Sequence, residues 1–144
     1  GLVLQTLKTM VSPSVCWVDA DAELREYPYQ LGLYHSDNVD AAFRYSPNPD
    51  HPFNRAMSGT VWINCTAAGV TLAENWHARC HDHPRTWDQV HLADAYEQER
   101  TRPIPFRFAN LPPTYCQVFD DKTIQGVPVI VHYQASRRLK DSIR

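Results

Sequence analysis

The chain has 144 residues, of which 43% are hydrophobic and 21% charged, a composition that suits one globular domain of ordinary size. Its net charge is −2 and its isoelectric point is near 6.4, so no overall basic field attracts nucleic acid, which we exclude as a partner. No run of about 18 apolar residues is present, so we expect no membrane span.

The four cysteines stand far apart in the sequence and form no C-x-x-C pair: Cys16, Cys65, Cys80 and Cys116. Two of them, Cys16 and Cys116, lie among apolar or aromatic neighbours, where a free cysteine behaves as a small hydrophobic residue. The first residues, GLVLQTLKTMVSPS, are too short and too polar for a signal peptide. We therefore expect a reducing, cytoplasmic environment.

The first third of the chain alternates helical and strand patterns. Apolar residues recur at helical spacing over residues 4–10. Residues 15–18 form a short β-branched and aromatic run that predicts a buried strand, and residues 39–45 return to strand character. Residues 27–37 between them are expected to form a short helix or turn. The stretch 46–55 contains three prolines and no periodic pattern, which predicts a surface loop.

The remainder continues the alternation. Residues 58–65, SGTVWINC, predict a strand with Val61 and Ile63 on one face and Trp62 on the other. Helices are predicted over 67–79, where Gly69 weakens the start, and over 86–99. A Pro-rich extended segment follows at 100–121. A further buried strand is predicted at 127–133, and a basic terminal helix or tail at 135–144. We therefore predict a single α/β domain over residues 1–144, with a mixed sheet flanked by helices.

Two aspartates follow the first predicted strand in the sequence CWVDADAEL. In an extended chain, residues two positions apart point to the same side, so Asp19 and Asp21 share one face. Like charges on one face repel unless a positive group lies between them. Two interpretations stay open: a cation-binding pair, or an aspartate that caps the following helix or turn.

Polar residues end three of the predicted strands: Asp19 and Asp21, Asn64, and His132. In open α/β sheets, ligands gather beyond the carboxyl ends of strands. Two carboxylates and an imidazole form a suitable ligand set for Mn²⁺ or Mg²⁺. The alternative for His132 is a hydrogen-bonded histidine in the core.

A basic cluster follows this histidine and contains Arg137, Arg138 and Lys140. One guanidinium group can donate two parallel hydrogen bonds to phosphate oxygens, and lysine supplies a compact positive charge. Together with a divalent cation, these residues suit a diphosphate whose negative charge builds up as it leaves. The alternative is a solvated cationic tail.

A second group of metal-ligating residue types lies in NWHARCHDHP and contains His77, Cys80, His81 and His83. It has no partner pair elsewhere, so we predict a polar helix end and no zinc site. Asp88 and Gln89 open the next helix, where a first-turn carboxylate is also favoured by the helix dipole. A carboxylate beside an amide equally suits recognition of sugar hydroxyls.

The order of these motifs resembles the GT-A glycosyltransferases, in particular family 8 (glycogenin-like) and related nucleotide-diphospho-sugar transferases. The blocks are D-x-D, SGTVWIN, LAENW, WDQVHL, LPPTYC and VIVHYQASRRLK, and they extend from Val15 to Lys140. The last block is also similar to glycosyltransferase-type proteins of phages and mobile elements.

The resemblance implies a role for each matching residue. Asp19, Asp21 and His132 would bind Mn²⁺ or Mg²⁺ and, through it, a nucleotide-sugar diphosphate. The diphosphate would also contact Lys140 with Arg137 or Arg138. Ser58 and Gly59 match the block that approaches the donor sugar, and Asp88 and Gln89 match the block at the reacting sugar.

Two departures from the family pattern bear on activity. The segment QASRRLK lacks the glycine that usually precedes the lysine, and only 18 residues precede the D-x-D motif. Against the family pattern, we therefore expect most of the nucleotide-binding half to be absent from this chain, and we expect little activity unless an upstream segment, a second subunit or a homo-oligomer completes the site. The second hypothesis is a non-catalytic module that keeps the fold and binds a sugar, a metal or a partner.

Overall fold

The structure is a computed structural model that describes residues 2–9, 12–46 and 55–133. Arg137, Arg138 and Lys140 lie outside these residues, as does most of the predicted surface loop at 46–55. The elements in chain order are α1 (Leu2–Thr9), β1 (Ser14–Val18), β2 (Ala22–Leu24), α2 (Tyr29–Ser36), β3 (Ala41–Tyr45), β4 (Ala56–Asn64), α3 (Ala67–Asp82), α4 (Asp88–Arg100), β5 (Phe108–Asn110), a 3-10 helix (Pro113–Tyr115), β6 (Gln117–Val118) and β7 (Ile130–His132).

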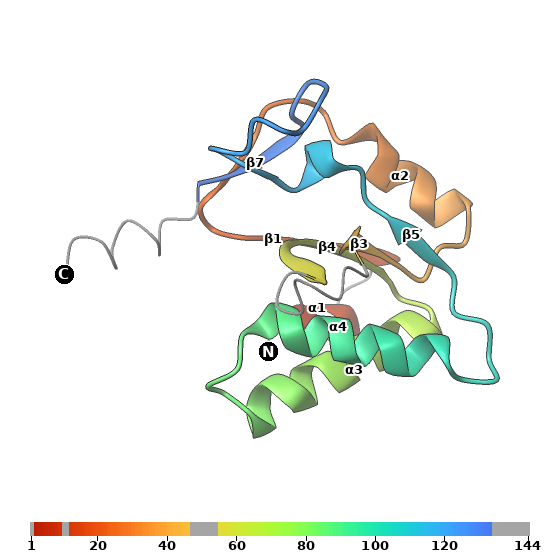
Figure 1. Cartoon of the computed structure of the whole chain (residues 1–144). Helices are drawn as coiled ribbons and strands as arrows, with labels where there is room; N and C mark the ends of the chain where they lie inside the picture. The colour runs from red at the N-terminus through yellow and green to blue at the C-terminus, as the bar shows by residue number, and fades with distance from the viewer. Residues whose placement is uncertain (1, 10–11, 47–54, 134–144) are drawn as a thin grey trace.

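The strands form two mixed sheets. The larger has the order β1-β4-β3-β5, in which β4 is antiparallel to both neighbours and β5 is parallel to β3. The smaller has the order β2-β7-β6, with β2 antiparallel and β6 parallel to β7. Helices α1, α3 and α4 lie on one side of the larger sheet, and α2 lies with the smaller sheet on the other (Figure 1). The predicted α/β architecture with a mixed sheet is confirmed.

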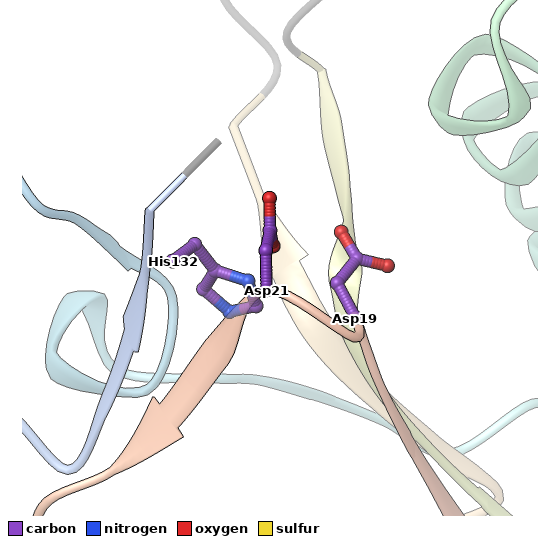
Figure 2. Close-up of side chains that lie close together, drawn as sticks. All are labelled: Asp19, Asp21 and His132. Atoms are coloured by element: carbon purple, nitrogen blue, oxygen red, sulfur yellow. The ribbon is translucent and has the colours of Figure 1, made fainter. Parts of the chain in front are cut away.

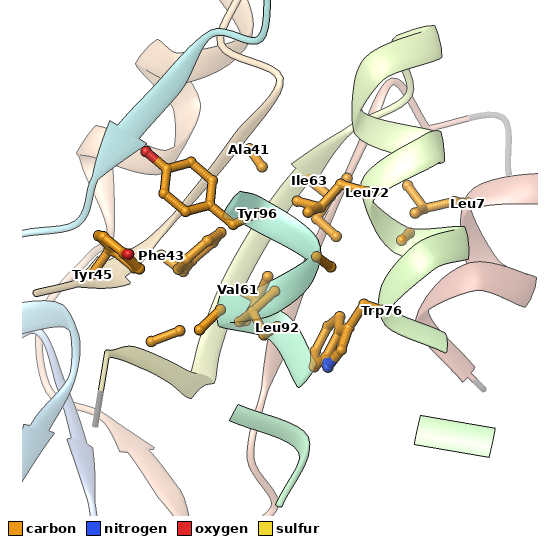
Figure 3. Packing of buried hydrophobic residues seen from close by; sticks show 14 residues of the cluster. Leu7, Ala41, Phe43, Tyr45, Val61, Ile63, Leu72, Trp76, Leu92 and Tyr96 are labelled. Carbon is orange, nitrogen blue, oxygen red and sulfur yellow. The ribbon is translucent and has the colours of Figure 1, made fainter. Parts of the chain in front are cut away.

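Strand β4 places its side chains in two separate cores, as its alternation predicts. Val61 and Ile63 pack with Leu72, Leu92 and other residues of the helical layer (Figure 3). Trp62 faces the opposite side, in a cluster with Tyr34 and Ile130. The buried centre of the larger sheet is thus closed on both faces, which holds the ends of its strands in fixed positions.

Strand β1 differs from the prediction of a buried strand. It lies at the edge of the larger sheet, paired with β4 alone, and Cys16 at its centre is exposed. Its apolar composition reflects the half-buried side chains Val15 and Trp17, which pack against the helical core. An apolar run of this length does not distinguish a central strand from an edge strand.

No helix among the described residues has both the length and the apolar composition that crossing a lipid bilayer requires.

Asp40 joins three elements at the base of the larger sheet. Its buried carboxylate accepts hydrogen bonds from the Thr66 hydroxyl at 2.6 Å and from the Arg107 backbone N–H at 2.8 Å. Thr66 in turn caps α3, because its hydroxyl accepts from the Gly69 N–H. Burial raises the pKa of Asp40. The hydrogen bonds from Thr66 and Arg107 lower this pKa by more than burial raises it, so the net shift is downward.

This lowered pKa predicts loss of stability in acid. A carboxyl with a depressed folded-state pKa stabilises the fold above its unfolded pKa of about 3.9, and that contribution disappears as the pH falls through the folded pKa. We expect the free energy of unfolding to fall below about pH 4, and Asp40→Asn to flatten that dependence while lowering stability at pH 7. Urea denaturation from pH 2 to 7 measures both. The exposed Asp37 serves as the control, and an Asp37→Asn profile identical to that of Asp40→Asn would contradict the assignment.

Candidate functional site

The backbone brings Asp19 and Asp21 to the junction of the two sheets. Val18 is the last residue of β1 and lies opposite Thr60, and the Asp19 N–H extends this ladder by donating to the Gly59 carbonyl at 2.9 Å. The chain then turns at Ala20 and enters β2, which places both aspartates between the sheets. The element that follows the motif is strand β2, and the backbone N–H of Ala22 donates to the Asp19 carbonyl at 3.0 Å across the turn.

His132 reaches the same place from the far end of the chain. It ends β7 opposite Ala22, and the next residue, Tyr133, donates its backbone N–H to the Asp21 carbonyl at 3.2 Å. Figure 2 shows the two carboxylates and the imidazole gathered at this junction. One potential ligand atom from each of Asp19, Asp21 and His132 lies within 4.8 Å of the others. Residues separated by more than 100 positions thus form one cluster.

The side chains of the cluster are held by neighbouring groups. The Trp17 indole N–H donates to Asp19 Oδ1 at 3.2 Å, which orients that carboxylate. Thr60 Oγ1 lies 2.9 Å from Nε2 of the buried His132. Burial lowers the pKa of His132, and the negative charges of Asp19 and Asp21 offset only part of that shift. The imidazole is therefore neutral at neutral pH, the form that donates a lone pair to a metal ion.

The donor set fits a hard divalent cation. Two carboxylates and a neutral imidazole suit Mn²⁺ and, through the carboxylates, Mg²⁺. Gly59 keeps the floor of the cluster open: a Cβ atom there would lie 2.8 Å from His132 Cε1, 2.9 Å from Nδ1 and 3.2 Å from Asp19 Oδ2. A side chain at residue 59 would thus occupy the space shared by the imidazole and the carboxylate.

Gly59→Ala is accordingly expected to weaken Mn²⁺ binding by about tenfold or more, the size of effect seen when ligand orientation is disturbed. The physical reason is displacement of the His132 ring by the new methyl group. Isothermal titration with Mn²⁺ measures the change. The matched control is Gly32→Ala, since a Cβ on Gly32 meets no atom within 4 Å. Equal Mn²⁺ affinity in both variants would show that the cluster does not hold the ion.

The other predicted site residues lie around this cluster or outside the described part of the chain. Ser58 is buried in β4 beside Gly59. Asp88 opens α4 and accepts the backbone N–H of Gln89 at 2.9 Å. It borders a cavity of about 170 Å³, lined by Val3, Leu4, Trp17, Ala73, Trp76, His77, Cys80 and Asp88. Trp17 therefore connects Asp88 with Asp19, because it lines this cavity and donates to that carboxylate.

The four residues of the second metal-ligating group, His77, Cys80, His81 and His83, have separate surroundings. His77 and Cys80 line the same cavity of about 170 Å³. His81 instead pairs with the neighbouring Asp82 at the exposed end of α3. The backbone carbonyl of His83 lies 3.0 Å from Nε2 of His91. That these four residues bind no zinc stays a prediction, which elemental analysis tests.

Two residues that contact the cluster, Trp17 and Thr60, are not among the site residues predicted from the sequence. The position of Trp17, two residues before Asp19 in an extended strand, is the one available signal, because such side chains share a face. Thr60 lies inside the recognised SGTVWIN block, but its contact with His132 depends on how the two sheets meet.

Comparison with known proteins gives a family by sequence and similar structures by fold. The family model described as nucleotide-diphospho-sugar transferase matches residues 11–142. No curated protein sequence matches the chain.

Three solved structures share the fold at low sequence identity. Mouse xyloside xylosyltransferase 1, in its apo form, has a TM-score of 0.58 and 13% identity, with 94% of this chain and 63% of that chain covered. A glycosyltransferase involved in glycosylation of the major capsid of PBCV-1 has a TM-score of 0.60 and 12% identity, with coverages of 99% and 72%. Galactosyltransferase LgtC, in complex with donor and acceptor sugar analogs, has a TM-score of 0.56 and 9% identity, with coverages of 91% and 56%. The chain thus spans less than two thirds of the first and third of these proteins.

Proposed function

Because this chain belongs to the family of nucleotide-diphospho-sugar transferases, we propose that it binds a divalent cation and a nucleotide sugar and transfers the sugar to an acceptor. The observation that carries the proposal is the meeting of Asp19, Asp21 and His132 at the junction of the sheets. The fold, which is of the GT-A glycosyltransferase type, supports it. The finer assignment to family 8, the shortened nucleotide-binding half and the cytoplasmic location stay predictions.

In this proposal, Asp19, Asp21 and neutral His132 hold Mn²⁺ or Mg²⁺. A bound divalent cation neutralises negative charge that develops on a departing diphosphate. Arg137, Arg138 and Lys140, which lie outside the described residues, would contact the same diphosphate through charge-assisted hydrogen bonds. The open floor at Gly59 leaves room for a ligand beside the carboxylates, which supports a role for Ser58 and Gly59 near the donor sugar.

Asp88 and Gln89 are proposed to face the reacting sugar. Their support is the cavity that Asp88 shares with Trp17, whose indole contacts Asp19. A carboxylate and an amide at a helix start can hydrogen-bond sugar hydroxyls in a fixed orientation, which positions the reacting centre.

The proposal is tested by titrating UDP-, GDP- and ADP-sugars in the presence of Mn²⁺ and assaying hydrolysis of each. Contacts to remote parts of a substrate normally position the reacting centre, and this chain covers only part of the length of the solved enzymes. We therefore expect dissociation constants of roughly 1 mM, which corresponds to about 4 kcal/mol, and slow turnover. Asp19→Ala is expected to abolish both.

Two outcomes would contradict this account in different ways. Micromolar binding or clear metal-dependent hydrolysis would show that the 144-residue chain forms a complete site. Binding of Mn²⁺ without any nucleotide sugar would favour the second candidate, a non-catalytic module that binds a metal, a sugar or a partner. This second candidate is supported by the limited coverage of the solved enzymes: the chain spans 63% of the first and 56% of the third.

A further inference from the structure

A second cavity, of about 510 Å³, lies between the ends of β3 and β4 and the segments that flank β6, and we call it the Arg44 cavity. Its size is within the range of about 300–1,000 Å³ that is usual for small-molecule pockets. Its lining comes from the paired strand ends and from residues within 113–118 and 121–125. Met57 supplies apolar surface, whereas Arg44 and Asp121 supply charge. This mixture is typical of a pocket that orients a polar ligand.

An irregularity in the larger sheet places this cavity close to the metal-ligand cluster. Between Phe43 and Arg44 of β3, the paired position in β4 jumps from Val61 to Met57. Residues 58–60 therefore have no partner in β3, and such bulges turn side chains in new directions. Met57 lines the cavity, and the residue two positions further along β4 borders the cluster.

The wall of the Arg44 cavity formed by residues near β6 also reaches the cluster. Cys116 lines the cavity, and its thiol forms a hydrogen bond with the Thr60 side chain, which lies 2.9 Å from the His132 ring. Val118, another lining residue, lies opposite His132 in the ladder between β6 and β7. A ligand in the cavity would thus lie one layer of side chains away from the cluster.

Arg44 brings a positive charge to this cavity. Its half-buried guanidinium forms no ion pair in the part of the chain that the structure describes. Burial raises the pKa of the Cys116 thiol to about 12, and the charge of Arg44 opposes part of that shift, so the guanidinium lies near this lining residue. A guanidinium group in this situation favours an anion, because its fork of N–H donors matches carboxylate and phosphate oxygens.

Asp121 brings the opposite charge to the same cavity. Its Oδ1 accepts hydrogen bonds from the Thr123 hydroxyl at 2.6 Å and from the Thr123 backbone N–H at 2.9 Å, and both lower the pKa of this carboxyl. No ion pair joins the side chains of Asp121 and Arg44, although both line the cavity. An ionised carboxylate accepts hydrogen bonds from hydroxyl groups and repels acids, so the two ends of the cavity suit different parts of one ligand.

From this arrangement we infer that the Arg44 cavity binds a hydroxylated ligand that carries an acidic group, with Arg44 at the carboxylate or phosphate and Asp121 at the hydroxyl groups. The ligand is the acceptor of the transferred sugar, an assignment that rests on the proposed function. The inference thus names an acidic sugar as the class of acceptor and Arg44 as the residue that selects it. Binding in the cavity requires neither a metal ion nor a nucleotide sugar, so it is measured separately from the proposed function.

The test is a set of ¹H–¹⁵N NMR titrations of the metal-free chain with glucuronate, glucose 6-phosphate and glucose. At least one acid is expected to shift the amide signals of Val118 and residues 123–125 and to bind about tenfold or more tightly than glucose, since the bond to Arg44 is charge-assisted. The ratio of the two acids' affinities distinguishes carboxylate from phosphate. Arg44→Gln should reduce the affinity for the acid to that for glucose, whereas Arg85→Gln, at an exposed arginine between α3 and α4, should leave it unchanged.

A second variant keeps the test independent of any folding defect at Arg44. Asp121→Asn removes the negative charge from the cavity, so inorganic phosphate should bind this variant more tightly than the wild type. Thermal unfolding shows whether the variants are folded. Absence of these amide shifts with both acids at about 50 mM, or equal affinity of an acid for the wild type and Arg44→Gln, would overturn the inference.

A transfer assay tests the acceptor assignment. With Mn²⁺ and the UDP-, GDP- and ADP-sugars, the wild type is expected to transfer sugar to the acid that binds and not to glucose. Transfer to glucose in preference to both acids would overturn the acceptor class. A wild type that binds the acid but no nucleotide sugar would instead refute the proposed function and leave the binding site in place.

Discussion

Asp21→Ala is expected to lower the affinity for Mn²⁺ by more than about 100-fold, because loss of a ligand exceeds the 10- to 100-fold effect of losing an outer contact. A ligand that binds only the native state stabilises it by about 2.7 kcal/mol at 100 times its dissociation constant. Mn²⁺ should therefore raise the melting temperature of the wild type and leave that of Asp21→Ala unchanged. Calorimetric titration and thermal unfolding measure the two effects.

The pH dependence of Mn²⁺ affinity and a control variant provide further tests of this prediction. Since the bound form requires neutral His132, Mn²⁺ affinity should fall as the pH drops through the lowered pKa of that histidine. Asp37→Ala removes an exposed carboxylate away from the cluster and should bind Mn²⁺ as the wild type does. A Mn²⁺ response that survives in Asp21→Ala would contradict the ligand set.

Gly69→Ala is expected to destabilise the fold by about 2 kcal/mol or more. A Cβ atom on Gly69 would lie 2.2 Å from the Asn64 carbonyl oxygen, 2.8 Å from the Asp40 carbonyl oxygen and 3.2 Å from Ile63 Cγ2. The Asp40 carbonyl accepts the Asn64 N–H at 2.9 Å and cannot move without breaking that bond. Overpacking costs about 1–3 kcal/mol or more, and an approach of 2.2 Å to a backbone oxygen belongs at the upper end of that range. The helix propensity of alanine, which is favoured over glycine by about 1 kcal/mol, offsets part of this cost and leaves a net loss of about 2 kcal/mol or more.

Urea denaturation followed by circular dichroism measures this loss. Gly32→Ala is the matched control, because Gly32 lies in α2 and a Cβ atom added there would meet no atom within 4 Å. That variant should equal or exceed the wild type in stability, as helix propensity alone requires. A Gly69→Ala protein as stable as Gly32→Ala would mean that α3 packs less closely on β4 than the structure indicates.

The parts of the fold that follow from local patterns could be predicted from the sequence. Alternation in SGTVWINC placed Val61 and Ile63 opposite Trp62, and the two cores confirm it. The shared face of Asp19 and Asp21 is likewise a property of extended backbone. The position of His132 at the end of an apolar strand predicts a polar group at the sheet edge, and the structure brings this residue to the aspartates.

Features that depend on contacts between distant segments could not be predicted in this way. The three-residue strand β2 exists because β7 pairs with it, and its own sequence carries no distinct strand pattern. Gly69 looked like a weak point in a helix, yet the structure shows close approach to two carbonyl groups as its reason. The contact between Thr60 and His132 depends on where the two sheets meet, which no sequence periodicity indicates.

The most direct test of the central claim is anomalous diffraction at the manganese absorption edge from crystals of the wild-type protein grown with Mn²⁺. The account predicts one strong peak between the carboxylates of Asp19 and Asp21, about 2 Å from their oxygens and from a ring nitrogen of His132. The peak should be absent from crystals of Asp21→Ala. A peak at His77, Cys80 and His81, or no peak within coordination distance of Asp19, Asp21 and His132, would contradict it.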